Sequence, residues 1–160
     1  MDKKNGKGKK YYCYKNLKFE GEYYNGKQWK GKGYDKEGNI LYELKNGNGK
    51  IKECDYDKGE IIFEGEYLNG ERNGKGKEYF KGELIFEGEY LNGKRNGHGK
   101  NYFINNNDIL EFEGEYLNGE KNGKGKMYWN NGQLSFEGEF LNGKKNWIWK
   151  RIRPLWKINI

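Results

Sequence analysis

FEGEYLNG, residues 63–70, is the stretch of sequence that decides the fold. The same string begins again at Phe86 and Phe112, and close copies begin at Phe19 and Phe136. Most copies run on into NGKGK or a near variant, so the chain repeats itself at a period of about 23 residues. Repetition at such a period predicts an array of small structural units that stack on one another.

Each unit is expected to be a β-hairpin. Phe63, Gly65 and Tyr67 alternate with glutamates, which is the period of a half-buried strand. Asn69-Gly70 tolerates the positive φ angles of a tight turn, and residues 74–80 form the returning strand. For the next turn, at residues 81–83, we expect a three-residue loop with a bulge.

The expected register gives the hairpin two unlike faces. Glu64 lies opposite Lys77 and Glu66 opposite Lys75 on a charged face, whereas the aromatic rings and the glycines share the other face. Glycine there lets a neighbouring ring lie flat on the backbone. This register leaves Glu78 on the aromatic side.

We therefore predict an all-β fold: an elongated, single-layer, solenoid-like antiparallel meander of tandem hairpins over residues 1–146. It comprises about six units after a half-unit at residues 5–9 that supplies only a second strand. The unit at residues 41–50 keeps the glycine spacing but loses FEGEY. Residues 147–160 break the pattern and are expected either to cap the last hairpin or to anchor the chain.

Composition supports an ordered array whose buried surface is aromatic. The chain is 33% hydrophobic, 17% aromatic and 34% charged, and it contains no Ala, Val or Thr. Disordered segments are usually poor in aromatic residues, so this content argues against disorder. The net charge of +7 is spread through interleaved Lys and Glu, with a modest preference for anionic partners.

The two cysteines and the hydropathy pattern predict a cytoplasmic protein. Cys13 and Cys54 have neither a zinc-site spacing nor the density of a disulfide scaffold, so we expect reduced thiols. The first residues lack the apolar region of a secretory signal, and no run of apolar residues is long enough to span a membrane.

No pattern in the sequence points to catalysis. The repeated Glu-Gly-Glu resembles a carboxylate pair, but copies with lysines in register are what a charge ladder requires. The Gly-x-Gly elements lack the third glycine and the helix of a phosphate loop. The single His98 is expected to be an exposed strand residue. We expect no enzyme activity, metal, cofactor or small-molecule substrate, and no nucleic-acid partner because the lysines have glutamates beside them.

The pattern aromatic-x-Gly-Glu-aromatic-x-Asn-Gly-Lys-x-x-Gly-x-Gly resembles the MORN repeat, and the resemblance extends from about Asn5 to Lys145. It implies a twisted array of β-hairpins that acts as a non-catalytic scaffold or adaptor. It also implies a place in a cytoskeletal, ciliary or membrane-proximal assembly.

The expected function is to bind a protein partner in a groove of aromatic rings over glycines. The rings expected to bind it are Phe63, Tyr67, Phe86, Tyr90, Phe112, Tyr116, Phe136 and Phe140. The alternative is a peripheral protein that binds anionic lipid through lysine-rich loops and the C-terminal segment. The residues expected to anchor it are Trp147, Trp149, Arg151, Arg153 and Trp156.

Overall fold

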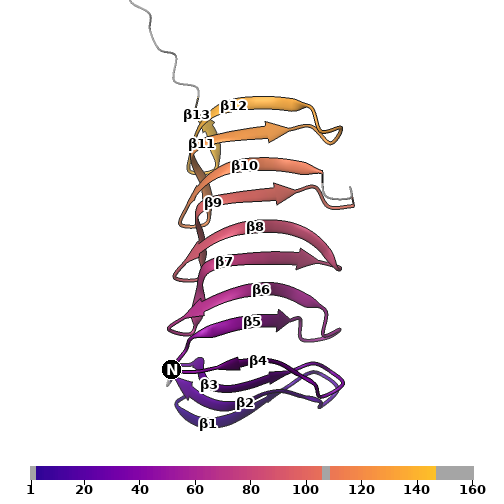
Figure 1. Cartoon of the computed structure of the whole chain (residues 1–160), viewed down its shortest axis with the longest axis vertical. Helices are drawn as coiled ribbons and strands as arrows, with labels where there is room; N and C mark the ends of the chain where they lie inside the picture. Colours follow the sequence, from indigo (N-terminus) through magenta and orange to yellow (C-terminus); the bar gives the residue numbers. More distant parts are fainter. Residues whose placement is uncertain (1–2, 106–108, 147–160) are drawn as a thin grey trace, which may run out of the picture.

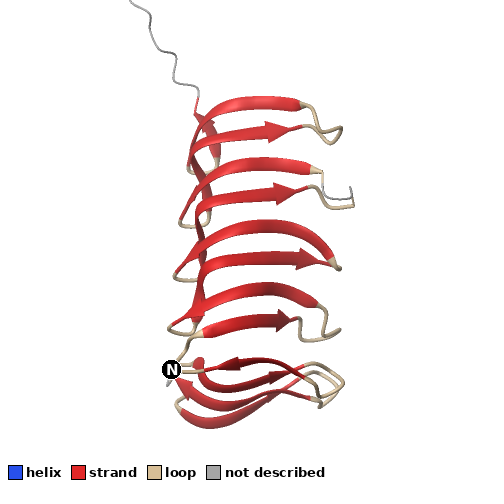
Figure 2. Ribbon diagram, in the orientation of Figure 1, coloured by secondary structure: helices blue, strands red, loops and turns tan. Residues whose placement is uncertain are grey.

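The computed structural model describes residues 3–105 and 109–146, and every regular element in these ranges is a β-strand. The strands are β1 (Gly6–Tyr11), β2 (Leu17–Tyr24), β3 (Lys27–Tyr34), β4 (Ile40–Leu44), β5 (Gly49–Cys54), β6 (Ile61–Leu68), β7 (Glu71–Phe80), β8 (Glu83–Leu91), β9 (Lys94–Tyr102), β10 (Leu110–Leu117), β11 (Glu120–Tyr128), β12 (Leu134–Leu141) and β13 (Lys144–Asn146). They follow one another along the long axis of the molecule (Figure 1), with loops at both sides (Figure 2). The predicted all-β class is confirmed.

The strands form two antiparallel sheets in sequence order. β1 to β4 make a four-stranded sheet, and β5 to β13 make a nine-stranded sheet. The predicted meander of sequential hairpins is confirmed within each sheet. The expectation of one unbroken array is wrong at a single point, between β4 and β5.

Two substituted glycines explain this break. In the regular hairpin of β6 and β7, Gly65 lies opposite Gly76, and a Cβ built on Gly65 would lie 2.7 Å from the Cα of Gly76. The degenerate unit has Leu44 and Ile51 at these two positions, because Leu44 pairs with Gly31 of β3 and Ile51 pairs with Gly65 of β6. Side chains of that size prevent the two backbones from approaching so closely. β4 and β5 are joined by an isolated bridge at their turn and then separate.

The four-stranded sheet turns its aromatic side onto the start of the nine-stranded sheet. Phe19 of β2, Leu44 of β4 and Ile51 of β5 form one buried cluster. The Nζ of Lys18 also donates a hydrogen bond to the carbonyl oxygen of Cys54 at 2.5 Å. The first four strands therefore cover the N-terminal end of the longer sheet, as the capping units of repeat proteins do, and they lie at the lower end in Figure 1.

Asn-Gly turns close the hairpins at one side of the array. Both residues of each turn have positive φ, as two-residue type I′ turns require. These turns are Asn25-Gly26, Asn46-Gly47, Asn69-Gly70, Asn92-Gly93, Asn118-Gly119 and Asn142-Gly143. At the other side, Phe80 lies opposite Glu83, so Lys81-Gly82 is also a two-residue turn. The predicted three-residue loop is wrong because the extra residue is Ile85, which forms a bulge on β8 opposite Glu78 and Tyr79.

A larger bulge folds the three hairpins of β6–β7, β8–β9 and β10–β11 near their Asn-Gly turns. In β6 and β7, Gly65 lies opposite Gly76 but Tyr67 lies opposite Arg72, so Glu66 alone faces Asn73-Gly74-Lys75. The hairpins of β8–β9 and β10–β11 have the same shift. Such a bulge bends the strand and increases its twist. It turns the end of the hairpin, which we call the tip, over the aromatic side of the sheet.

Backbone hydrogen bonds hold the tips in a column. The N–H of Gly93 donates to the carbonyl oxygen of Arg72 at 2.9 Å, and the N–H of Gly119 donates to that of Arg95 at 2.8 Å. The equivalent bonds of Gly70 and Gly143 are 2.8 and 2.9 Å long. The column is the vertical element along the left of Figure 1. Each tip is thus fixed by the preceding one, in register with the repeat.

Candidate partner-binding groove

The aromatic rings of the nine-stranded sheet form one continuous row. Phe63, Phe86 and Phe112 lie on the sheet, and the rings at the start of the tips fill the spaces between them in edge-to-face pairs. The Phe86 ring lies 5.7 Å from Tyr90 and 5.3 Å from Tyr116. These geometries are the favourable ones for aromatic pairs. Each ring therefore contacts a neighbour from its own repeat and one from the next.

Cationic side chains of the tips cover the outer side of the row. The guanidinium of Arg72 lies 4.0 Å from the centre of the Phe63 ring, and that of Arg95 lies 3.9 Å from Phe86. Lys121 lies 4.6 Å from Phe112 in the next repeat. A cation at this distance from a ring face is attracted to it and also excludes water. The rings are consequently a closed core.

Glu78 holds two of these cations in place. Its carboxylate accepts hydrogen bonds from the hydroxyl of Tyr90 at 2.6 Å and from Nη2 of Arg95 at 2.7 Å, and it lies 3.5 Å from Nη1 of Arg72. Burial alone would raise the pKa of Glu78, but the hydrogen bonds from Arg95 and Tyr90 and the two positive charges lower it below its ordinary value. Burial, followed by the bond to Glu78, raises the pKa of Tyr90.

Two other side chains along the row accept hydrogen bonds from a tyrosine hydroxyl and an arginine in the same way as Glu78. Glu53 accepts a hydrogen bond from Nε of Arg72 at 2.8 Å and another from the hydroxyl of Tyr67. Asn101 accepts from the hydroxyl of Tyr116 at 2.6 Å and from Nη1 of Arg95 at 3.2 Å. Sequence reasoning missed these cation positions, although the placement of Glu78 on the aromatic side, now confirmed, indicated that a cation had to lie near it.

Substituting Glu78 with Gln is expected to lower the free energy of unfolding at neutral pH by about 1–3 kcal/mol, because two guanidinium groups lose their shared anion. The folded-state pKa of Glu78 lies below the ordinary value of 4.5, so the carboxylate stabilises the fold above that pH. The difference between wild type and E78Q should therefore shrink as the pH falls below 4.5. Urea unfolding at a series of pH values measures it. The control is Glu113→Gln, which makes the same change on the charged face of the sheet. It should change the free energy of unfolding little.

The structure places the predicted partner-binding rings in this core. Phe63, Phe86 and Phe112 are 0% exposed, and Tyr90, Tyr116 and Phe140 are buried beside them. Tyr67 and Phe136 are partly buried against the same cluster. Partner binding by these rings remains a prediction, but their burial argues against it and their packing accounts for their spacing. The predicted anchor residues, Trp147 to Trp156, lie outside the described residues.

The hollow surface of the array is the charged face. A groove of about 660 Å³ crosses β5 to β9, and a second of about 340 Å³ continues over β9 to β12. His98 lines both grooves, so they adjoin at this side chain. The walls are Lys and Glu side chains, and the glycine backbones opposite the core rings lie between them. From the sequence the groove was expected on the aromatic face, so this hollow in the charged face was not predicted.

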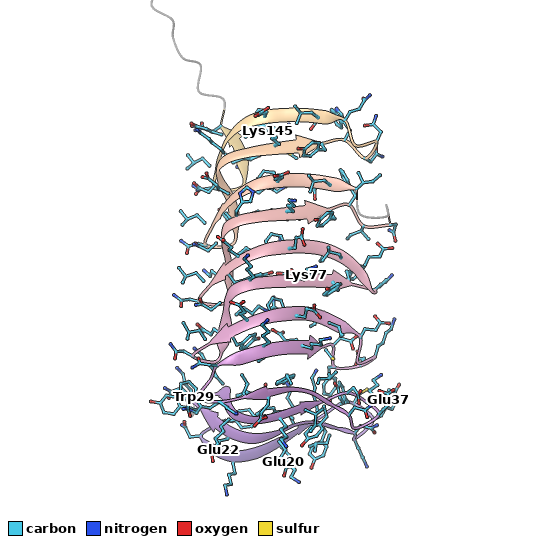
Figure 3. The ribbon with its side chains drawn as sticks, in the orientation of Figure 1. Glu20, Glu22, Trp29, Glu37, Lys77 and Lys145 are labelled. Atoms are coloured by element: carbon cyan, nitrogen blue, oxygen red, sulfur yellow. The ribbon has the colours of Figure 1, made fainter. Side chains whose placement is uncertain are left out.

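Rows of Lys and Glu alternate across the groove. Lys77 lies opposite Glu64, as predicted, and opposite Glu87 on the other side. The predicted pairing of Glu66 with Lys75 is wrong, because the bulge breaks the register between Gly65 and Tyr67. The ion pair of Lys77 with Glu87 has a distance of 3.6 Å, and both side chains are well exposed, so it adds little stability. Figure 3 shows Lys77 on the middle of β7. The alternating Lys and Glu rows therefore give the groove a charge pattern, and they contribute little to the stability of the fold.

His98 interrupts the lysine rows, at a position where other repeats have Lys. Its side chain is 59% exposed, and its Nε2 lies 3.9 Å from a carboxylate oxygen of Glu113. Its backbone N–H donates to the carboxylate of Glu89 at 3.2 Å. The expectation of an exposed strand residue is confirmed.

Within residues 3–105 and 109–146, no group of three or more His, Cys, Asp or Glu side chains is arranged to hold a metal ion. In the same ranges, no helix is long and apolar enough to cross a membrane.

The bent hairpins, the stacked tips and the adjoining grooves define a solenoid-like repeat protein. The family model of the MORN repeat matches residues 63–82, 86–107, 112–134 and 136–146. The chain belongs to the MORN-repeat family, whose members are generally non-catalytic scaffolds. No curated protein matches the chain. The matched segments begin at Phe63, which is in the first regular hairpin after the break between the two sheets.

Proposed function

We propose that this MORN-repeat protein is a scaffold that holds a protein partner along its charged groove, within a cytoplasmic assembly attached to the cytoskeleton, a cilium or a membrane surface. The observation that carries the proposal is the pair of adjoining grooves over β5 to β12. It offers a partner many contacts along one line. The rings expected from the sequence to bind the partner are buried in one aromatic cluster, which supports the charged face as the binding face.

The groove suits an extended or helical segment that itself carries both charges. Its floor is glycine backbone, which lets a partner approach closely, and its walls alternate in sign from strand to strand. Complementary charge of this kind selects the register of a bound segment and speeds its association. Anionic lipid, the alternative partner, gains little from this groove, because a glutamate row lies beside each lysine row.

Filling the groove tests the proposal. Lys75 and Lys100 line it from strand positions, and Trp is well tolerated in strands, so K75W/K100W should keep the fold while occupying the site. We expect affinity for the partner to fall at least about tenfold. The partner is first captured from the native cell with wild type and identified by mass spectrometry. Its affinity for each variant is then measured with purified components.

The matched control is Lys94→Trp, which makes the same change on β9 at an exposed tip position outside the groove. K94W should bind the partner as wild type does. Wild-type affinity in K75W/K100W, with an unchanged circular dichroism spectrum, would show that the partner binds elsewhere.

A further inference from the structure

A polar pocket of about 270 Å³ lies between the four-stranded sheet and the start of the nine-stranded sheet. Lys10 and Tyr23 line it from the first sheet, and Glu53 and Tyr67 line it from the second. The two sheets meet between β4 and β5 in Figure 1. The volume is just below the ~300 Å³ at which pockets for drug-sized ligands begin. It therefore suits a smaller molecule, which would contact both sheets.

Lys10 stands where the regular repeats have a hydrogen-bond acceptor. In the nine-stranded sheet the hydroxyl of Tyr67 donates to Glu53, which is the residue paired with Phe63. The corresponding acceptors in the next two repeats are a glutamate and an asparagine. In the four-stranded sheet the residue paired with Phe19 is Lys10. This position thus has a cationic donor in place of an acceptor.

The cation of the regular repeats is also replaced in this hairpin. Arg72 lies opposite Tyr67, whereas the neutral Gln28 lies opposite Tyr23. The Oε1 of Gln28 accepts a hydrogen bond from the hydroxyl of Tyr42 at 3.0 Å, so the amide presents its NH₂ group as a donor. The hairpin of β2 and β3 therefore places a lysine, a tyrosine and an amide around the position that a glutamate carboxylate has in the regular repeats.

Lys18 adds a second ammonium group to the pocket. Its Nζ donates to the carbonyl oxygens of Cys54 at 2.5 Å and of Asp55 at 3.1 Å. An ammonium group has three N–H donors, so one is left for a ligand. Burial, followed by the positive charge of Lys10, lowers the pKa of Lys18. The two ammonium groups are thus close enough to repel each other, and an anion between them would relieve that repulsion.

The carboxylate in the lining does not neutralise these lysines. Glu53 is the only acidic residue that lines the pocket in the described part of the chain. Arg72 already holds its two oxygens, with Nε at 2.8 Å and Nη2 at 3.0 Å. Within residues 3–105 and 109–146, neither Lys10 nor Lys18 forms an ion pair with a carboxylate. The pocket therefore has an excess of positive charge.

We propose that this pocket binds a small organic carboxylate, whose oxygens take the place of the glutamate carboxylate of the regular repeats. Lys10, the hydroxyl of Tyr23 and the NH₂ group of Gln28 are the donors for one carboxylate group, and Lys18 is the donor for a second. Hydrogen bonds between ionised groups are the stronger kind, so a dicarboxylate of a few carbon atoms fits best. Because both sheets line the pocket, the ligand also stabilises their contact.

Calorimetric titration of the full chain at low salt tests the proposal. The probes are malonate, succinate and glutarate, each at up to ~10 mM, and we expect at least one to bind with a Kd below about 1 mM. Succinamide, which has the size of succinate without its charge, should not bind. The bound dicarboxylate should also raise the midpoint of thermal unfolding. If none of the three dicarboxylates binds, or if succinamide or inorganic phosphate binds more tightly than they do, the proposal is wrong.

Lys10→Glu provides the sharpest variant, because it restores the residue type that the regular repeats have at this position. The new carboxylate should occupy the site, so K10E should keep its β-type circular dichroism spectrum and bind the dicarboxylate at least about tenfold more weakly. Lys10→Met, which removes the charge and keeps the length, should weaken binding as well.

The matched control is Lys7→Glu, which makes the same change on the same strand. Lys7 lies opposite Glu22 on the charged face of β1, so K7E should bind the dicarboxylate as wild type does. Wild-type affinity in folded K10E and K10M, or an equal loss in K7E, would show that the dicarboxylate does not bind in this pocket.

Discussion

Replacing Phe86 with Ala is expected to lower the free energy of unfolding by about 3–5 kcal/mol, the range for removing a fully buried aromatic ring. Phe86 is 0% exposed and lies between the rings of Tyr90 and Tyr116, with Arg95 above it. Its loss removes contacts in two repeats at once and leaves a cavity at the centre of the row. Urea unfolding followed by far-ultraviolet circular dichroism measures the change.

The control for F86A is Leu91→Ala in the same repeat. Leu91 is 49% exposed on the outer side of a tip, so its truncation should change stability by less than about 1 kcal/mol. If F86A cost no more than L91A, the ring would not belong to a closed core. The tips would then leave the aromatic side open.

Gly88→Ala is expected to cost about 1–3 kcal/mol or more, although it adds only a methyl group. That methyl would lie 2.7 Å from the Cα of Gly99, from the carbonyl oxygen of His98 and from the Phe86 ring. Two of these neighbours are backbone atoms of the paired strand β9. They cannot move without breaking hydrogen bonds between β8 and β9. Thermal or urea unfolding of G88A measures the cost.

Gly8→Ala provides a graded comparison for G88A. Gly8 also lies in the middle of its strand, β1. The methyl group of G8A would contact only the edge of the Tyr23 ring, at 3.1 Å. A ring can shift by a few tenths of an ångström, so we expect G8A to cost clearly less than G88A. Equal costs would mean that loss of backbone flexibility, and not close packing of the strands, sets the need for glycine.

Much of this fold is predictable because the residue pattern within each repeat predicts the strands and turns of that repeat. The alternation in FEGEY defines a strand, and Asn-Gly can form a type I′ turn without strain. The charge register follows from the spacing, and the structure has Glu64 opposite Lys77 as expected. Repetition strengthens these inferences, because the same pattern must satisfy several consecutive hairpins.

The bend of the hairpin is where prediction from the sequence stops. Asn73-Gly74 has the composition of a turn, but the structure uses it as a bulge opposite Glu66. Composition cannot separate these two uses, because both need a residue with positive φ. Once the bulge turns the tip over the sheet, the aromatic side becomes core. The charged side is then the hollow surface of the array.

The break between the sheets has a sequence signal that becomes clear only from the packing. Leu44 and Ile51 replace the pair of glycines that lets two strands approach each other. Without the contact between Gly65 and Gly76 as a reference, the degenerate unit reads as a weak copy of the same hairpin. The loss of both glycines in one unit predicts a split ladder.

Hydroxyl-radical footprinting of the free chain tests most directly the claim that the tips close the aromatic side and leave the charged groove as the open face. Phe80 is 45% exposed and Trp129 is 61% exposed, so these two side chains provide internal references for full reaction. Phe63, Phe86 and Phe112 should remain unmodified under conditions that oxidise both references. Oxidation of these three rings at the rate of Phe80 would contradict the account, because the aromatic side would then be open to solvent and available to a partner.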